Sequence, residues 1–189
     1  MSDDGAAADD MRALRSAIGD TEVIIARVPA GLWDAPTPCS GVDVRDLVNH
    51  LVTGNLYFAS LVSGLPLPDG DEDHLGADPA GAFRAAAASL VAALDAPGVL
   101  DRTYRLPVGQ VPGQALIEIR LIEHLGHGWD VAKATGQAAP FQEDVAERGL
   151  AIARRQLHNR PEAAFGAEVK VREDAPAIDR LAGFLGRRA

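Results

Sequence analysis

Apolar residues recur along most of the chain at steps of three, four and seven, which is the spacing of an α-helix that buries one face. Prolines, glycines and polar cap residues interrupt this pattern at intervals and mark where helices begin and end. The pattern therefore predicts four long helices, over residues 9–28, 42–63, 79–94 and 113–135.

The boundaries of these helices rest on local signals. Ser40 is followed three residues later by Asp43, an acidic variant of the capping box, which predicts the start of the second helix. Pro97 and Gly98 follow the third helix and interrupt it. Gly136 is expected to cap the carboxyl end of the fourth helix.

The remaining segments are shorter. A polar, acidic loop is predicted between the second and third helices, and an extended stretch with a short hairpin between the third and fourth. No internal repeat or linker divides the sequence, so residues 1–189 are expected to form one all-α domain. That domain is a four-helix bundle with additional short C-terminal helices and a small hairpin, in which residues 160–189 form a C-terminal appendage. The shorter segments that accompany the four long helices are the loop 64–78, the hairpin region 101–113, a helix over 143–157, an extended piece over 168–171 and a small helix over 176–185.

Composition excludes several classes of partner. The 189 residues carry a net charge of −9 and no basic stripe, which argues against binding to nucleic acid. The apolar runs are far shorter than the roughly 20 residues of a membrane-spanning helix. The acidic N-terminus does not have the pattern of a secretory signal, and a single cysteine fits a reducing compartment, so we expect a cytoplasmic protein.

Three polar residues stand out against the apolar pattern. Glu123 and His127 are four residues apart, so on a helix they point the same way and can bind one ion together. His50 lies close to the apolar stripe of the second helix, and a histidine on a neighbouring antiparallel helix could complete such a site. Three ligands of this type leave coordination positions open, as in catalytic divalent-metal sites.

A simpler interpretation stands beside this one. A single histidine near an apolar stripe is more often a hydrogen-bonded core residue, whereas an inward-facing glutamate needs a partner. Asp130 follows His127 by three residues and could orient its imidazole, join the metal shell or lie exposed on the helix surface. His124 points about 100 degrees away from Glu123 and is expected to lie outside the shell.

Other motifs in the sequence give weaker indications of a functional site. Asp69, Asp71 and Asp73 have calcium-loop spacing, but His74 replaces the required glycine and Ala80 the closing glutamate, so a calcium loop is rejected. Cys39 precedes the second helix, where a helix dipole can lower the pKa of a thiol, but a buried inert thiol is the favoured interpretation. The sequence has no phosphate-binding glycine loop, nucleophile elbow or paired CxxC.

Three separated stretches resemble a known family in the same order along the chain: TPCSGVDVRDLVNHLVTGN, IEHLGHGWDVAKATG and FGAEVKVREDAPAIDRLAGFLGR. The sequence resembles an actinobacterial family of metal-binding proteins of the DinB-like superfamily, related to the N-terminal domain of mycothiol-dependent maleylpyruvate isomerase. The resemblance implies a four-helix bundle that holds one divalent ion, commonly zinc or nickel, through His, Glu and His. In this chain, the matching residues are His50, Glu123 and His127.

The resemblance also has a limit. The isomerase carries a further C-terminal domain that helps to shape its substrate site, whereas this chain has only a short tail after the bundle, so the maleylpyruvate activity cannot be transferred. Relatives in the superfamily are similar to thiol transferases that use a low-molecular-weight thiol.

The favoured function is a metal-dependent transferase or isomerase that takes a small thiol, mycothiol by resemblance, and an electrophilic substrate. The alternative is a non-catalytic metal-binding bundle that acts as a sensor or dimerisation module, which allows for a homodimer. Hydrolysis by metal-bound water is a third option, but it requires a general base that the sequence does not identify. An open coordination position beside a pocket would favour catalysis, whereas closure by Asp130 or His124 would favour a structural ion.

Overall fold

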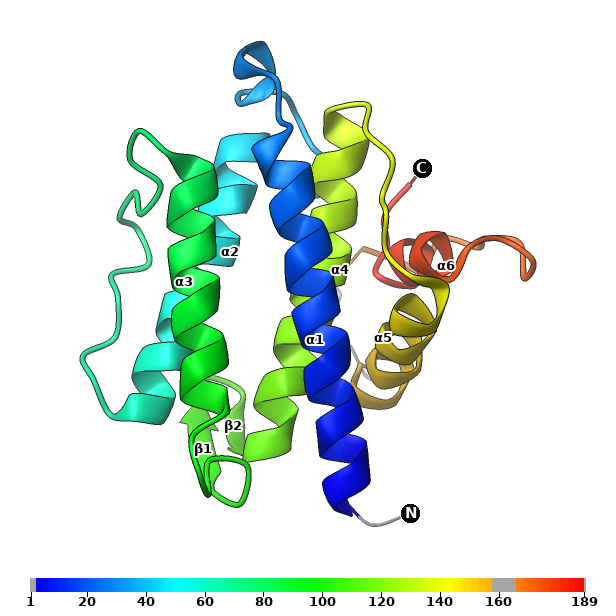
Figure 1. Cartoon of the computed structure of the whole chain (residues 1–189). Coiled ribbons are helices and arrows are strands. Elements are labelled where there is room, and N and C mark those ends of the chain that lie inside the picture. Colours follow the sequence, from blue (N-terminus) through cyan, green and yellow to red (C-terminus); the bar gives the residue numbers. More distant parts are fainter. Residues whose placement is uncertain (1–2, 158–165, 189) are drawn as a thin grey trace.

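The computed structural model describes residues 3–157 and 166–188. Each of the four long helices contacts two others, because α1 packs on α4, α4 on α2, α2 on α3 and α3 on α1. These contacts close a four-helix bundle, with a small two-stranded hairpin at one end (Figure 1). The predicted all-α fold is therefore confirmed. The four helices are α1 (Asp3–Ala26), α2 (Val44–Ser63), α3 (Pro79–Leu94) and α4 (Gly113–Ala134).

The order of the helices determines which residues face one another. The loop over residues 64–78 runs back along the length of the bundle, so α2 and α3 start at the same end, whereas α4 runs in the opposite direction (Figure 1). Because α2 and α4 are antiparallel neighbours, the first turns of α2 lie beside the later turns of α4. This arrangement brings His50 opposite Glu123 and His127.

Two helix starts differ from the sequence prediction. The cap of α2 is Asp43, whose side chain accepts a hydrogen bond from the backbone N–H of Asp46 at 2.8 Å, so the predicted Ser40 cap is wrong. The helix α1 begins at Asp3, six residues before the predicted start. Its first turns are rich in alanine, a strong helix former, and in aspartate, which favours the positive end of the helix dipole.

Two other boundary predictions are confirmed. The helix α3 begins at Pro79, and the Asp78 side chain caps it by accepting a hydrogen bond from the N–H of Gly81 at 2.9 Å. After α4, Gly136 adopts a φ of 68°, and the backbone N–H of Gln137 donates to the carbonyl of Ala132 at 2.8 Å. This pattern satisfies the last carbonyls of the helix.

The helix α4 lies at the centre of the molecule. It contacts α1, α2, α5 and α6, so it is buried on nearly every side, and Leu116, Leu121, Leu125 and Trp129 are among its core residues. The same burial encloses Arg120, His124 and Asp130, which must therefore find partners inside the protein. Within the described residues, no helix combines the length and apolar character that crossing a bilayer would need.

The smaller elements flank the bundle. A short 3-10 helix, η1 (Ala30–Leu32), follows α1, and α5 (Glu143–Gln156) and α6 (Ala177–Phe184) pack together beside α4 (Figure 1). The predicted hairpin forms from β1 (Thr103–Leu106) and β2 (Gly109–Pro112). The predicted extended piece at 168–171 forms no strand, although the N–H of Val169 donates to the carbonyl of Gly183 at 2.9 Å. Residues 160–165 of the predicted appendage lie outside the described residues.

Candidate metal centre

The three residues singled out in the sequence meet at one wall of the bundle. Glu123 and His127 are one turn apart on α4, and His50 comes from the facing turn of α2. Nε2 of His50 lies 2.9 Å from Oε2 of Glu123, and Nε2 of His127 lies 3.4 Å from the same oxygen. Their ligand atoms all lie within 4.8 Å of one another. The structure therefore brings two imidazole nitrogens and one carboxylate oxygen together.

This group faces the outside of the bundle rather than its centre. The side chain of His50 is 56% exposed and that of Glu123 is 28% exposed, whereas that of His127 is 12% exposed. The neighbours Leu47 and Leu51 are buried, so His50 lies at the edge of the apolar stripe of α2. A small molecule can reach the group from solvent.

The charges in the group are strongly coupled. Burial would raise the pKa of Glu123, but hydrogen bonds with His127 and His50, together with nearby Arg120, hold it well below its usual value. Burial would lower the pKa of His127, but its hydrogen bonds to Asp130 and Glu123 raise that pKa to about 9. The ionised carboxylate of Glu123 thus favours a positive charge on His127 beside it.

Asp130 lies behind His127, on the side away from Glu123. Its carboxylate is buried and accepts a hydrogen bond from Nδ1 of His127 at 3.1 Å. Arg187, from the tail after α6, donates to the same carboxylate oxygen at 3.0 Å. Asp130 therefore orients the imidazole and leaves Nε2 directed toward Glu123, as carboxylates do behind metal-binding histidines.

His124 belongs to a different cluster. Its side chain is fully buried, its Nε2 lies 3.0 Å from Oδ1 of Asn55, and its ring packs edge-on against Phe83. Burial, with the neighbouring Arg120, lowers its pKa well below the usual value, so the imidazole is neutral at pH 7. The structure thus places His124 away from the group formed by His50, Glu123 and His127.

A pocket of about 370 Å³ opens beside this group. All three candidate ligands line it, and its other walls are mostly apolar, with Gly126 and Arg187 alongside. Cys39 also lines the pocket, half-buried, and burial raises the pKa of its thiol. The apolar part of the wall consists of Val42, Leu47, Ile122 and Leu185.

Two residues that line the pocket were not predicted as site residues. Arg187 ends the third stretch that carries the family resemblance, but nothing in that stretch gives it a role, and Cys39 was expected to be a buried inert thiol. Both reach the pocket only because the segment before α2 and the tail after α6 converge on α4. No signal in the sequence indicates this convergence.

A larger hollow of about 1170 Å³ lies between the first turns of α1 and the start of α4. Among the described residues no histidine or cysteine lines it, and two ion pairs lie in its wall, Arg15 with Asp95 and Arg155 with Glu118. This hollow therefore lacks the chemistry of the smaller pocket, and we assign the candidate site to the latter.

A helical bundle with this group at its wall agrees with the family comparison. The chain belongs to the family described as the mycothiol maleylpyruvate isomerase N-terminal domain, whose model matches residues 5–132. That match covers α2 and α3, nearly all of α1 and α4, and the three candidate ligands, whereas α5, α6 and Arg187 lie beyond it.

The chain is also similar to two curated proteins of Mycobacterium tuberculosis, from strains CDC 1551 / Oshkosh and ATCC 25618 / H37Rv, both described as uncharacterized. The identity to each is 36% over 167 residues, which span 87% of this chain and 90% of the relative. No solved structure matches the chain significantly.

Proposed function

We propose that this protein is a divalent-metal-dependent enzyme that transfers or isomerises through a small thiol. His50, Glu123 and His127 would hold one ion, zinc or nickel as in the family, and mycothiol is the thiol that the family description suggests. The observation that carries the proposal is that the group of three ligands opens directly onto a pocket.

The residues present fit such an ion. Imidazole nitrogen and carboxylate oxygen are ligands that zinc and nickel accept. Ligands about 2.0–2.1 Å from a tetrahedral ion lie about 3.4 Å from each other. The distances from Oε2 of Glu123 to Nε2 of His50 and of His127 are 2.9 and 3.4 Å, so His127 already has this spacing and His50 would move slightly away from Glu123. His50 can make this movement because its side chain is more than half exposed.

The surroundings of the group support catalysis over a structural role. Asp130 is engaged by His127 and Arg187, and His124 by Asn55, so neither side chain is directed at the fourth coordination position. The pocket is lined by all three candidate ligands, so a thiol inside it could reach an ion held by them. A structural ion, by contrast, is usually enclosed by four protein ligands.

Each part of the site would have a distinct task. A divalent ion held here would bind the sulfur of the thiol and keep it as a thiolate at neutral pH. Asp130 fixes the imidazole of His127, and the buried cation Arg120 favours the ionised form of Glu123. The apolar wall formed by Val42, Ile122 and Leu185 would exclude water and hold the body of the electrophilic substrate.

Cobalt(II) provides a direct test, because sulfur bound to cobalt gives a charge-transfer absorption in the near ultraviolet. Adding mycothiol, or a simpler thiol, to the cobalt-loaded protein should produce this band and release protons. The variant Cys39→Ser is the matched control: it removes the chain's own thiol and should keep the band. His50→Ala should lose the band together with the metal.

The outcomes separate the proposed functions. A spectrum unmoved by millimolar thiol at neutral and mildly alkaline pH, with cobalt still bound, would favour the non-catalytic metal-binding bundle. A protein that takes up neither cobalt, zinc nor nickel would reject both interpretations.

A further inference from the structure

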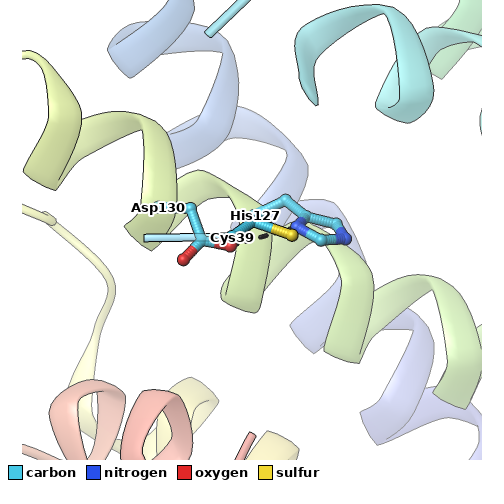
Figure 2. A group of neighbouring side chains, drawn as sticks. All are labelled: Cys39, His127 and Asp130. Carbon is cyan, nitrogen blue, oxygen red and sulfur yellow. Dashed lines mark hydrogen bonds and ion pairs between the residues drawn. The ribbon is translucent and has the colours of Figure 1, made fainter. Parts of the chain in front are cut away.

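The two ring nitrogens of His127 face two different groups of side chains. Nε2 faces Glu123, on the side of the candidate metal centre, whereas Nδ1 faces Asp130 at 3.1 Å. Cys39 lies beside the same end of the imidazole as Asp130 (Figure 2). The ligand atoms of Cys39, His127 and Asp130 all lie within 4.8 Å of one another. A thiol, an imidazole and a carboxylate form a second group that zinc could accept.

A positive charge already occupies this second group. Nη2 of Arg187 donates to Oδ2 of Asp130 at 3.0 Å and lies 3.4 Å from Nδ1 of His127, and Nε of Arg187 approaches both carboxylate oxygens at 3.3 Å. Nη1 donates to the backbone carbonyl of Leu185 at 3.0 Å, which ties the guanidinium to the end of α6. The guanidinium is thus the counter-charge of a carboxylate that is 0% exposed.

We propose that Arg187 selects the metal position: its guanidinium takes the place of a cation between Cys39, His127 and Asp130, and so confines the ion to Nε2 of His127. This inference rests on the proposed function only in taking Nε2 of His127 as the ligand of the resident ion. In this proposal the C-terminal tail determines where the ion binds. Cys39 belongs to a latent metal site, formed with His127 and Asp130, that can take an ion only when Arg187 is absent.

The chemistry of imidazole makes the two positions alternatives. A neutral imidazole has one proton and one free lone pair on its two nitrogens, so an ion on Nε2 requires the proton on Nδ1. Asp130 accepts that proton's hydrogen bond, and Arg187 donates to the same carboxylate oxygen and so holds it in place. When an ion on Nε2 keeps His127 neutral, removing the guanidinium leaves the buried carboxylate without a cation, which is unfavourable. A divalent ion can then bind at Nδ1, Asp130 and Cys39: the imidazole proton moves from Nδ1 to Nε2, where Glu123 accepts its hydrogen bond, and the Cys39 thiol gives its proton to solvent.

Cobalt(II) loading of four chains tests this, with no thiol added: wild type, Arg187→Ala, Arg187→Lys and the double variant Arg187→Ala/Cys39→Ser. We expect no sulfur-to-cobalt band in wild type and a clear band in Arg187→Ala. The band should be absent from the double variant, because its only source is Cys39. Arg187→Lys is the control that keeps the positive charge, and it should resemble wild type. If Arg187→Ala fails to fold, Arg187→Met, which keeps the length of the side chain, replaces it.

Three results would overturn the inference. A Cys39-dependent band in wild type would show that Arg187 does not exclude the ion. Cobalt bound to a folded Arg187→Ala chain without the band, or no cobalt bound to that folded chain, would show that Cys39, His127 and Asp130 form no latent site. Failure of the proposed function gives a different pattern: cobalt is then absent from wild type, while the band in Arg187→Ala still shows that the guanidinium occupies a metal position between Cys39, His127 and Asp130.

Discussion

The carboxylate of Asp130 accepts a hydrogen bond from Nδ1 of His127 at 3.1 Å, although Asp130 itself lies outside the group that faces the pocket. Asp130 is fully buried, and its only cationic partner besides this histidine among the described residues is Arg187. The orientation of His127 thus depends on a residue three positions further along the same helix and on another from the C-terminal tail.

The first prediction concerns this carboxylate. Replacing Asp130 with Asn removes the charge that orients His127, so metal affinity should fall by about 10–100-fold, the usual effect of losing such a partner. Competition with a chromogenic chelator measures the change. Asp34→Asn, an exposed aspartate of the same chain, should leave affinity unchanged. Equal affinities for the two variants would remove Asp130 from the site.

The second prediction concerns the ligands themselves. His50→Ala and Glu123→Ala should abolish tight binding of a single divalent ion but keep a mainly helical protein, because neither side chain belongs to the apolar core. Elemental analysis and circular dichroism give the two measurements. His74→Ala is the matched histidine control, since His74 lies in the loop and contacts the Asp69 carbonyl at 2.9 Å. Unchanged metal content in Glu123→Ala would show that another carboxylate binds the ion.

The third prediction links the ion to stability. An ion that binds only the folded state at 100 times its dissociation constant stabilises that state by about 2.7 kcal/mol. For a domain of this size, that corresponds to an increase of about 5–10 °C in Tm. A chelator should therefore lower the Tm of the metal-loaded protein by this amount in a thermal scan. The same chelator should leave His50→Ala unchanged; an equal shift in that variant would point to a different binding site.

The fourth prediction is a pH dependence that comes from a residue outside the candidate metal centre. Burial raises the pKa of Asp20 above 3.8, and its buried Oδ2 has no hydrogen-bond partner among the described residues. The folded state therefore binds this proton more tightly than the unfolded chain, so the ionised form destabilises the protein at neutral pH, and the penalty disappears as pH falls toward 3.8. Asp20→Asn should be more stable than wild type at pH 7, with a gain that shrinks toward pH 4. Denaturant titrations at several pH values would measure it, and a gain independent of pH would contradict the explanation.

The fifth prediction uses two glycines within helices. A Cβ atom added at Gly54 would overlap the guanidinium of Arg120, which is 2% exposed and held by Asn55 and the carbonyl of Leu51. Gly54→Ala should destabilise the protein by about 1–3 kcal/mol because Arg120 has no room to move. Gly19→Ala is the matched comparison: nothing lies within 4 Å of its added Cβ, so it should stabilise α1 by about 0.5–1 kcal/mol. Chemical denaturation of both variants tests the pair.

The sequence by itself determined the features that depend only on residues close together along the chain, such as the positions of the helices. The helical spacing of apolar residues predicted all four helices of the bundle, and Pro79 and Gly136 marked ends that the structure confirms. The pairing of Glu123 with His127 is also local, because residues four apart share one face of a helix whatever surrounds it. The cap of α2 shows the limit of such signals, since Ser40 and Asp43 both suit a cap and the chain uses the second.

Only the tertiary structure decided the rest of the site. His50 meets Glu123 across 73 positions of sequence, and Arg187 meets Asp130 across 57. Both contacts depend on the antiparallel packing of α2 against α4 and on the return of the tail to α4. The spacing of residues in the chain does not encode which helices become neighbours. That choice follows from burying all the apolar stripes at once. It places a thiol, a guanidinium and the three candidate metal ligands around one pocket.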